Sequence, residues 1–280
     1  MIVKYPGWDA VPNLAARTGP LFEELGLTAD ADAAYTKYLA GSDSPDSHGP
    51  LARFYIHQKQ PDRAIALARE YEKRAPVLLT ARIMTGAVAS RRSDAATQAA
   101  VEKWLDGALR GAAGSPELEA DLIGARAELL DAQGKFAESI AEYERALARG
   151  KSDLVVNNLC MLLALHAPAR AEEAVKMMSE LIAIRGPDPT FLDTRAVAYL
   201  VSSRPAEAVK DLEMALVQYE RASYRFHLAW AIDLDAVVNK RIFAADHLKI
   251  AKAAGLGADD LHPLEFKRYA ELLAKYVLDK

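Results

Sequence analysis

The chain has 280 residues, of which 51% are hydrophobic and 26% are charged, and its formal net charge is −4. This composition is ordinary for a soluble folded protein, and the mild acidity gives no electrostatic reason to bind nucleic acid. The longest apolar run, residues 159–165, is too short to span a bilayer, and the first residues lack the apolar core of a signal peptide. We therefore expect a cytoplasmic protein that does not enter a membrane.

The first predicted elements are two helices, over residues 14–25 and 29–40. They form one helix pair that matches the pattern of the rest of the chain poorly. We accordingly assign residues 1–44 to an N-terminal segment with an irregular helix pair.

From residue 45 onward, helix pairs recur at a nearly constant spacing. A small residue opens the second helix of each pair, and the steps between these residues are 37, 38, 35, 34 and 36 positions: Ala64, Val101, Ser139, Ala174, Ala208 and Ala244. Small residues are needed where two antiparallel helices cross closely, and stacked pairs bury apolar faces that no pair buries alone. The spacing predicts an all-α array over residues 45–255, with no sheet of consequence.

The clearest repeat begins at Asp188-Pro189, which is typical of a helix N-cap followed by proline in the first turn. An earlier repeat begins in the same way at Ser115-Pro116. The clearest repeat then reads Leu192-x-x-Arg195-Ala196-x-x-Tyr199 and Ala208-x-x-x-Leu212-x-x-Ala215. This pattern resembles the tetratricopeptide repeat, whose usual length is 34 residues.

The resemblance is to bacterial tetratricopeptide-repeat proteins, and in particular to the C-terminal repeat region of larger multidomain chains. It implies a right-handed superhelical solenoid of antiparallel helix pairs. The chain departs from the family pattern because the bulky residue that opens the first helix is Ile or Leu, never Trp, and because Ala or Cys replaces the helix–helix glycine.

Residues 256–280 are predicted to form a capping helix that ends the array. An amphipathic pattern runs from residue 263 to residue 278, and its apolar side carries Leu264, Leu272, Leu273, Tyr276 and Val277. A terminal helix with one polar face is what a solenoid needs in order to stop. We expect it to cover the apolar side of the last repeat.

Motifs for catalysis, metal binding or cofactor binding are not found in the sequence. Cys160, the only cysteine, lies in an apolar helical run and is interpreted as a small buried hydrophobe. No pair of the six histidines has metal-ligand spacing on a helix face: His48, His57, His166, His227, His247 and His262. Residues 111–115 are glycine-rich but lack the Lys-Ser/Thr ending of a phosphate loop. We expect no catalytic residue, no metal and no cofactor.

The resemblance implies that a protein or peptide binds the concave face lined by the first helices. Nine residues are predicted to point there: Arg53, Glu128, Asn157, Met161, Asp193, Val197, Phe226, Trp230 and Asp233. Their acidic, apolar and aromatic mixture favours a basic and apolar partner segment. The paired Lys and Asn residues with which some family members hold a terminal carboxylate are missing. Trp230 has a second interpretation, as core filler between the last two repeats.

Two other functions stay open at this level. The array is alternatively an architectural spacer or self-association module of a larger protein. A helical-toroid enzyme with paired carboxylates is disfavoured because such sites are lined by many aromatic side chains, and only 8% of these residues are aromatic. The sequence does not identify the partner or the oligomeric state.

Overall fold

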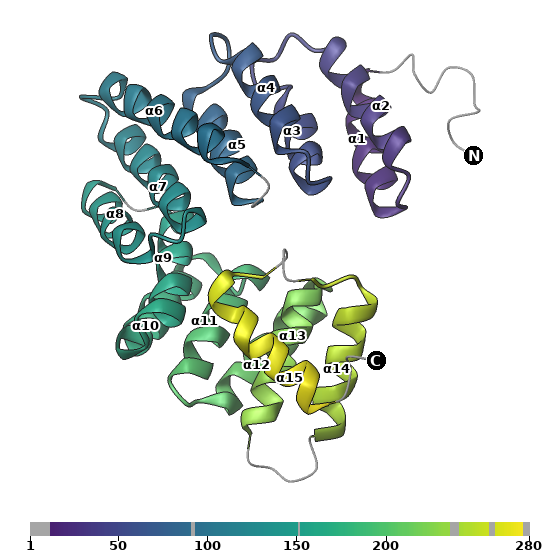
Figure 1. Ribbon diagram of the computed structural model, residues 1–280, viewed down its shortest axis with the longest axis vertical. Coiled ribbons are helices and arrows are strands. Elements are labelled where there is room, and N and C mark those ends of the chain that lie inside the picture. Colours follow the sequence, from purple (N-terminus) through teal and green to yellow (C-terminus); the bar gives the residue numbers. More distant parts are fainter. Residues whose placement is uncertain (1–11, 91–92, 151, 236–240, 258–260, 277–280) are drawn as a thin grey trace. The chain divides into compact units, whose positions relative to one another are not determined.

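The computed structural model describes residues 12–90, 93–150, 152–235, 241–257 and 261–276, without the side chains of residues 12–17, 241 and 242. Across these residues the chain forms fifteen α-helices and two short 3-10 helices, and no strand (Figure 1). The predicted all-α repeat fold is thus confirmed. The chain divides into two compact units, residues 1–134 and 135–280, and each is described separately below.

The N-terminal unit contains the first seven helices. They are α1 (Pro12–Glu24), α2 (Thr28–Ala40), α3 (Gly49–His57), α4 (Pro61–Tyr71), α5 (Val77–Ala89), α6 (Ala95–Gly111) and α7 (Pro116–Ala132). Helices α1 and α2, α3 and α4, and α5 and α6 pack as pairs, while α3 also contacts α5, and α5 also contacts α7. Helices α3, α5 and α7 are called first helices below.

The C-terminal unit contains the remaining helices. They are α8 (Phe136–Arg149), α9 (Asp153–His166), η3 (Pro168–Arg170), α10 (Ala171–Arg185), α11 (Pro189–Val201), α12 (Pro205–Gln218), α13 (Ala222–Leu234), α14 (Arg241–Ala253), η5 (Pro263–Glu265) and α15 (Phe266–Lys275). Helices α9 and α10, α11 and α12, and α13 and α14 form pairs. The first helices α9, α11 and α13 also contact one another in succession, which continues the repeat.

The small residues that set the repeat spacing lie at the helix crossings. All six side chains have a relative exposure of 0%: Ala64, Val101, Ser139, Ala174, Ala208 and Ala244. A larger side chain at any of these positions would push the paired helices apart, because protein interiors are close-packed. The six positions share one structural role, and this explains why the sequence repeats there.

The two predicted helix starts behave differently. Asp188 caps α11 as expected, since its carboxylate accepts a hydrogen bond of 2.8 Å from the backbone N–H of Thr190 and Pro189 occupies the first helical position. Ser115 precedes α7, but its side chain makes no capping hydrogen bond. Here Pro116 and the acidic residues Glu117 and Glu119 of the first turn favour the helix start instead.

The predicted C-terminal helix is shorter than its pattern and begins with a 3-10 turn. His262 accepts a hydrogen bond from the backbone of Leu264, and Glu265 accepts one of 3.0 Å from the backbone of His262, which together form a capping box. Leu272 is fully buried in the same apolar cluster as Leu228 and Leu248 of the last repeat. The predicted residues 277 and 278 lie outside the described residues.

Candidate protein-binding surfaces

A cavity of about 500 Å³ lies between the first helices α3 and α5 of the N-terminal unit. This α3–α5 pocket has apolar walls formed by Ile56, Leu79 and Ile83. Gly86 helps to keep it open, since a Cβ atom at this position would lie 3.4 Å from the Cδ1 atom of Ile56. Two glycines line the pocket, Gly49 and Gly86, so the backbone of both helices borders it.

Two arginines give the α3–α5 pocket a positive charge. Arg53 of α3 and Arg82 of α5 both line it and are exposed, and among the described residues neither guanidinium forms an ion pair. Asp46 is the acidic residue of the lining. Arg53 is one of the residues predicted to point into the groove. Arg82 was not predicted, because the repeat that contains α5 departs most from the family pattern, and its residues are the hardest to align with those of the other repeats.

Glu128 of α7 is tied to the neighbouring first helix of this unit. Its carboxylate accepts a hydrogen bond of 3.1 Å from Oγ1 of Thr85 on α5. Burial raises the pKa of Glu128 to about 6, although the Thr85 hydrogen bond and the charge of Arg82 oppose the shift. Glu128 therefore becomes protonated as the pH falls through about 6 and is mostly ionised at pH 7.

The inner face of the C-terminal unit carries a ladder of buried polar contacts. Thr194 of α11 donates a hydrogen bond of 2.8 Å to Oδ1 of Asn157 on α9. His227 of α13 donates from Nδ1 to Oδ1 of Asp193 over 2.6 Å and from Nε2 to Oε1 of Glu265 over 2.7 Å. Both hydrogen bonds of His227 end on buried carboxylates. Together with the bond between Thr194 and Asn157, they form a ladder from α9 through α11 and α13 to η5.

The charge on His227 is stabilised by its two partners. Burial alone would lower the pKa of His227, but the charges of Asp193 and Glu265 and their hydrogen bonds outweigh it and raise the pKa to about 10. Burial also opposes the ionisation of Glu265, and the attraction of His227 still holds the pKa of that carboxyl below its usual value. At neutral pH the three groups thus form a carboxylate–imidazolium–carboxylate cluster.

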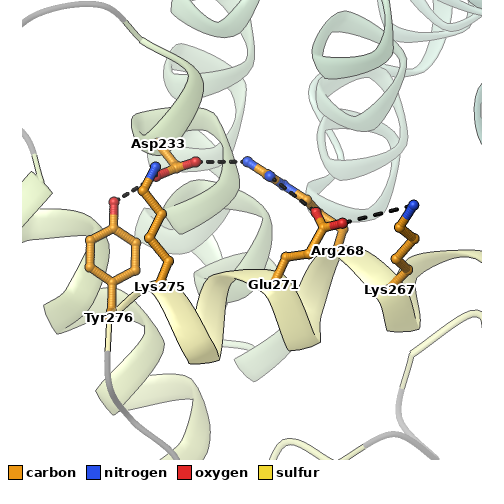
Figure 2. Close-up of polar contacts among 6 residues, drawn as sticks. All are labelled: Asp233, Lys267, Arg268, Glu271, Lys275 and Tyr276. Atoms are coloured by element: carbon orange, nitrogen blue, oxygen red, sulfur yellow. Dashed lines mark hydrogen bonds and ion pairs between the residues drawn. The ribbon is translucent and has the colours of Figure 1, made fainter.

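A second polar cluster joins α13 to α15 around Asp233, whose side chain is only 4% exposed (Figure 2). Arg268 donates to Oδ2 of Asp233 over 2.8 Å, while Lys275 and Tyr276 donate to Oδ1 over 2.5 and 2.7 Å. Burial opposes the ionisation of Asp233, but the hydrogen bonds from Lys275 and Tyr276 and the nearby positive charges lower its pKa. Asp233 therefore stays ionised and anchors the C-terminal helix.

Aromatic contacts lie between the two polar clusters. The ring of Phe226 on α13 meets that of Tyr269 on α15 edge to face, with centroids 5.2 Å apart. The guanidinium of Arg268 lies 5.7 Å from the ring centroid of Trp230. Phe226 is fully buried and Trp230 partly buried, and the C-terminal helix is what they contact. Trp230 thus contacts a segment from beyond the last repeat and also packs against the apolar cluster of the last repeats.

The nine predicted groove residues have different surroundings. Arg53 is exposed, Met161 and Trp230 are partly buried, and Val197 and Phe226 are fully buried. Asn157, Asp193 and Asp233 are engaged in the polar contacts described above, as is Glu128 in the N-terminal unit. A binding role for these residues stays a prediction.

His227 was not singled out from the sequence, although a signal was present. It follows Asp193 by 34 residues, close to one repeat length, so the two residues occupy nearly equivalent positions, the fifth residue of α11 and the sixth of α13. Equivalent positions on adjacent first helices lie side by side. An acidic residue and a histidine in that relationship predict a hydrogen bond, whereas the third partner, Glu265, lies outside the repeat frame.

Two other kinds of feature, a metal site and a membrane span, are absent from the described residues. No group of three or more His, Cys, Asp or Glu side chains there is arranged to hold a metal ion. In the same part of the chain, every helix is too short or too polar to cross a bilayer.

Comparison with known proteins shows the fold. No protein-family model matches the chain, and no curated protein matches it significantly. A tetratricopeptide-repeat protein from Parabacteroides merdae is similar in structure, with a TM-score of 0.53 and 14% identity over 95% of this chain and 98% of that one. The chain has a tetratricopeptide-like repeat fold. A solved structure of the APC/C hetero-tetramer Cut9–Hcn1 contains a chain with a TM-score of 0.56 and 14% identity, over 99% of this chain and 55% of that chain.

Proposed function

We propose that this protein is a non-catalytic interaction scaffold whose N-terminal unit binds a peptide segment in the α3–α5 pocket. The observation that carries the proposal is the pocket itself, an apolar cavity of about 500 Å³ between consecutive first helices with two exposed arginines at its edge. The tetratricopeptide-like fold supports it, and one similar structure is that of a complex, Cut9–Hcn1.

The chemistry of the pocket favours an acidic and apolar segment. Arg53 and Arg82 offer planar guanidinium groups that pair with carboxylates, and Ile56, Leu79 and Ile83 accept an aliphatic side chain between them. The sequence alone favoured a basic segment because it counted Glu128 and Asp193 as groove charges. Glu128 accepts a hydrogen bond from Thr85 and Asp193 pairs with His227, so both carboxylates are engaged within the protein and attract a basic segment less than the sequence indicates.

Selection from a random twelve-residue peptide display library tests this proposal. We expect the protein to enrich sequences with Asp or Glu beside Leu or Ile, and the variant Arg53→Glu/Arg82→Glu to bind the enriched peptides at least tenfold more weakly. The matched control is Arg69→Glu, which reverses an exposed charge on the second helix α4. Enrichment of Lys and Arg, or equal loss in the control, would contradict the proposal.

A second candidate, self-association, is favoured by exposed apolar side chains on the C-terminal unit. Ile184 and Val217 each stand one residue before the end of a second helix, α10 and α12, and are 73% and 88% exposed. Large exposed apolar side chains at equivalent positions favour association. Sedimentation of the protein and of Ile184→Lys/Val217→Lys tests this candidate: a dimer that the variant abolishes would support it.

A further inference from the structure

The C-terminal segment, residues 262–276, lies on the inner face of the C-terminal unit. It contacts the first helix α13, and it begins beside α8 and α9, where the rings of His262 and Phe136 have centroids 5.4 Å apart and η5 contacts α9. It ends beside the last turn of α13, at Asp233. In Figure 1, α15 crosses in front of α11 and α13. The expected cap at the end of the array is thus also a helix laid across the array.

The segment presents one helical face to this surface. Its contact residues follow one another at helical spacing: Glu265, Arg268, Tyr269, Leu272, Lys275 and Tyr276. Residues three, four and seven positions apart share a side of a helix. On the opposite face, Lys267 has a side chain that is 89% exposed, and Glu271 is also exposed (Figure 2). The arrangement corresponds to an amphipathic helix in a groove.

The two sides are complementary in charge. The receiving surface carries the carboxylates of Asp193 and Asp233 and the imidazolium of His227. The segment supplies the carboxylate of Glu265 to the imidazolium, and the cations of Arg268 and Lys275 to Asp233. Specific pairing of this kind selects a partner helix and fixes its register.

The helix depends on this surface for its stability. Helix α15 has ten residues, fewer than a helix needs to be stable alone in water. On the inner side of α15, Leu272 is the fully buried apolar side chain, and Tyr269 is 8% exposed. The other residues of α15 that contact the surface are polar or partly exposed. Polar contacts exchange with an equivalent partner more readily than a packed core does.

We propose that residues 262–276 are an internal ligand, and that the surface of α13 beneath them, where Asp193 of α11 holds His227, binds an amphipathic helix of the same chemistry from a partner protein. Such a helix carries an acidic residue at the position of Glu265. Counted from that residue, Arg follows three positions later, an aromatic residue four, Leu seven and Lys ten positions later. Its binding releases the chain's own segment. This surface is independent of the α3–α5 pocket.

A labelled synthetic peptide of residues 261–276 tests the proposal on the full-length protein. In the release variant, Arg268→Ala/Lys275→Ala/Tyr276→Phe, the internal segment loses its contacts with Asp233 while the receiving surface is unchanged. Because truncating one side of a buried charge pair weakens binding strongly, we expect the peptide to bind this variant at least tenfold more tightly than it binds the wild type. The matched control, Lys267→Ala, removes an exposed charge from the outer face of α15 and should behave as the wild type does.

Two further measurements separate the proposal from a structural role. Adding Asp233→Asn to the release variant should weaken peptide binding at least tenfold, because the peptide then loses its main anion. Hydrogen exchange should show fast amides in residues 266–275 of the release variant, with α11 and α13 still protected. A released segment without peptide binding, or loss of protection throughout α11 and α13, would overturn the proposal. A dimer that dissociates as peptide is added would assign the surface to a second copy and overturn it as well.

Discussion

Asp193 and His227 are joined by a hydrogen bond of 2.6 Å between Oδ1 of the carboxylate and Nδ1 of the imidazole. They lie on the consecutive first helices α11 and α13, and both side chains are at most 9% exposed. The second nitrogen of His227 donates to Glu265, which precedes the C-terminal helix. One imidazole thereby connects two repeats to the segment that follows the array.

Replacing His227 by Ala should destabilise the C-terminal unit by about 3–5 kcal/mol, since it leaves two buried carboxylates without their shared partner. Hydrogen exchange of α13 measures the loss. His57→Ala is the matched control, because His57 is 65% exposed beside Glu23 and exposed pairs contribute at most about 1 kcal/mol. Equal exchange in α13 of the wild type and His227→Ala would show that the cluster does not stabilise the fold.

Raising the pH should weaken the same cluster. Asp193 and Glu265 raise the pKa of His227 in the folded chain to about 10, well above the ordinary value of 6.5. The folded state therefore holds a proton that the unfolded state releases, so its stabilisation is complete below pH 6.5 and declines as the pH rises towards 10. Thermal unfolding measured between pH 6.5 and 10 should show this decline in the wild type and a smaller one in His227→Gln. Parallel curves for the two proteins would contradict it.

The repeat could be read from the sequence because its physical cause is local. A pair of antiparallel helices that cross closely needs a small residue at the crossing, and this requirement recurs with every pair, as at Ala174 and Ala208. Each repeat contacts only its neighbours, so the pattern along the chain carries most of the fold. The helix pairs over residues 49–253 follow from it.

The surfaces were less predictable because they depend on contacts outside the repeat frame. Glu265 reaches His227 across 38 positions, and Tyr276 reaches Asp233 across 43, a pairing that no periodic pattern indicates. Amphipathicity predicted a helix after Pro263 and an apolar side for it. It did not predict that this side lies on the inner face of α13, where Phe226 is buried against Tyr269.

Replacing Glu128 by Gln should stabilise the N-terminal unit at neutral pH. Burial raises the pKa of Glu128 in the folded chain to about 6, so the folded state binds this proton more tightly than the unfolded state does. The stability then falls as the pH rises from the ordinary value of 4.5 to 6 and stays lower above pH 6. The shift corresponds to about 2 kcal/mol, and the amide oxygen of Gln can still accept the Thr85 hydrogen bond.

Urea unfolding at pH 7.5 and pH 4 checks this expectation. Glu128→Gln should be the more stable protein at pH 7.5, and the two should be similar at pH 4, where the carboxyl is protonated in both states. Glu70→Gln, an exposed substitution on α4, should change the free energy of unfolding by less than about 0.5 kcal/mol. A variant that is less stable than the wild type at pH 7.5 would show that the charge of Glu128 is needed.

Cys160 should not react with a thiol reagent in the native protein. It lies in α9 with a relative exposure of 0%, and burial raises the pKa of its thiol to about 12. The thiolate is the reactive species, so both the burial and the raised pKa slow the reaction. Labelling with a disulfide reagent at pH 8 should proceed at least a thousandfold more slowly in the native protein than in urea, where one thiol per chain reacts.

The variant Lys267→Cys adds an exposed thiol at a position that is 89% exposed and should label at once. Rapid labelling of Cys160 in native protein would mean that α9 opens readily, and the buried ladder that begins at Asn157 would then not hold the first helices together.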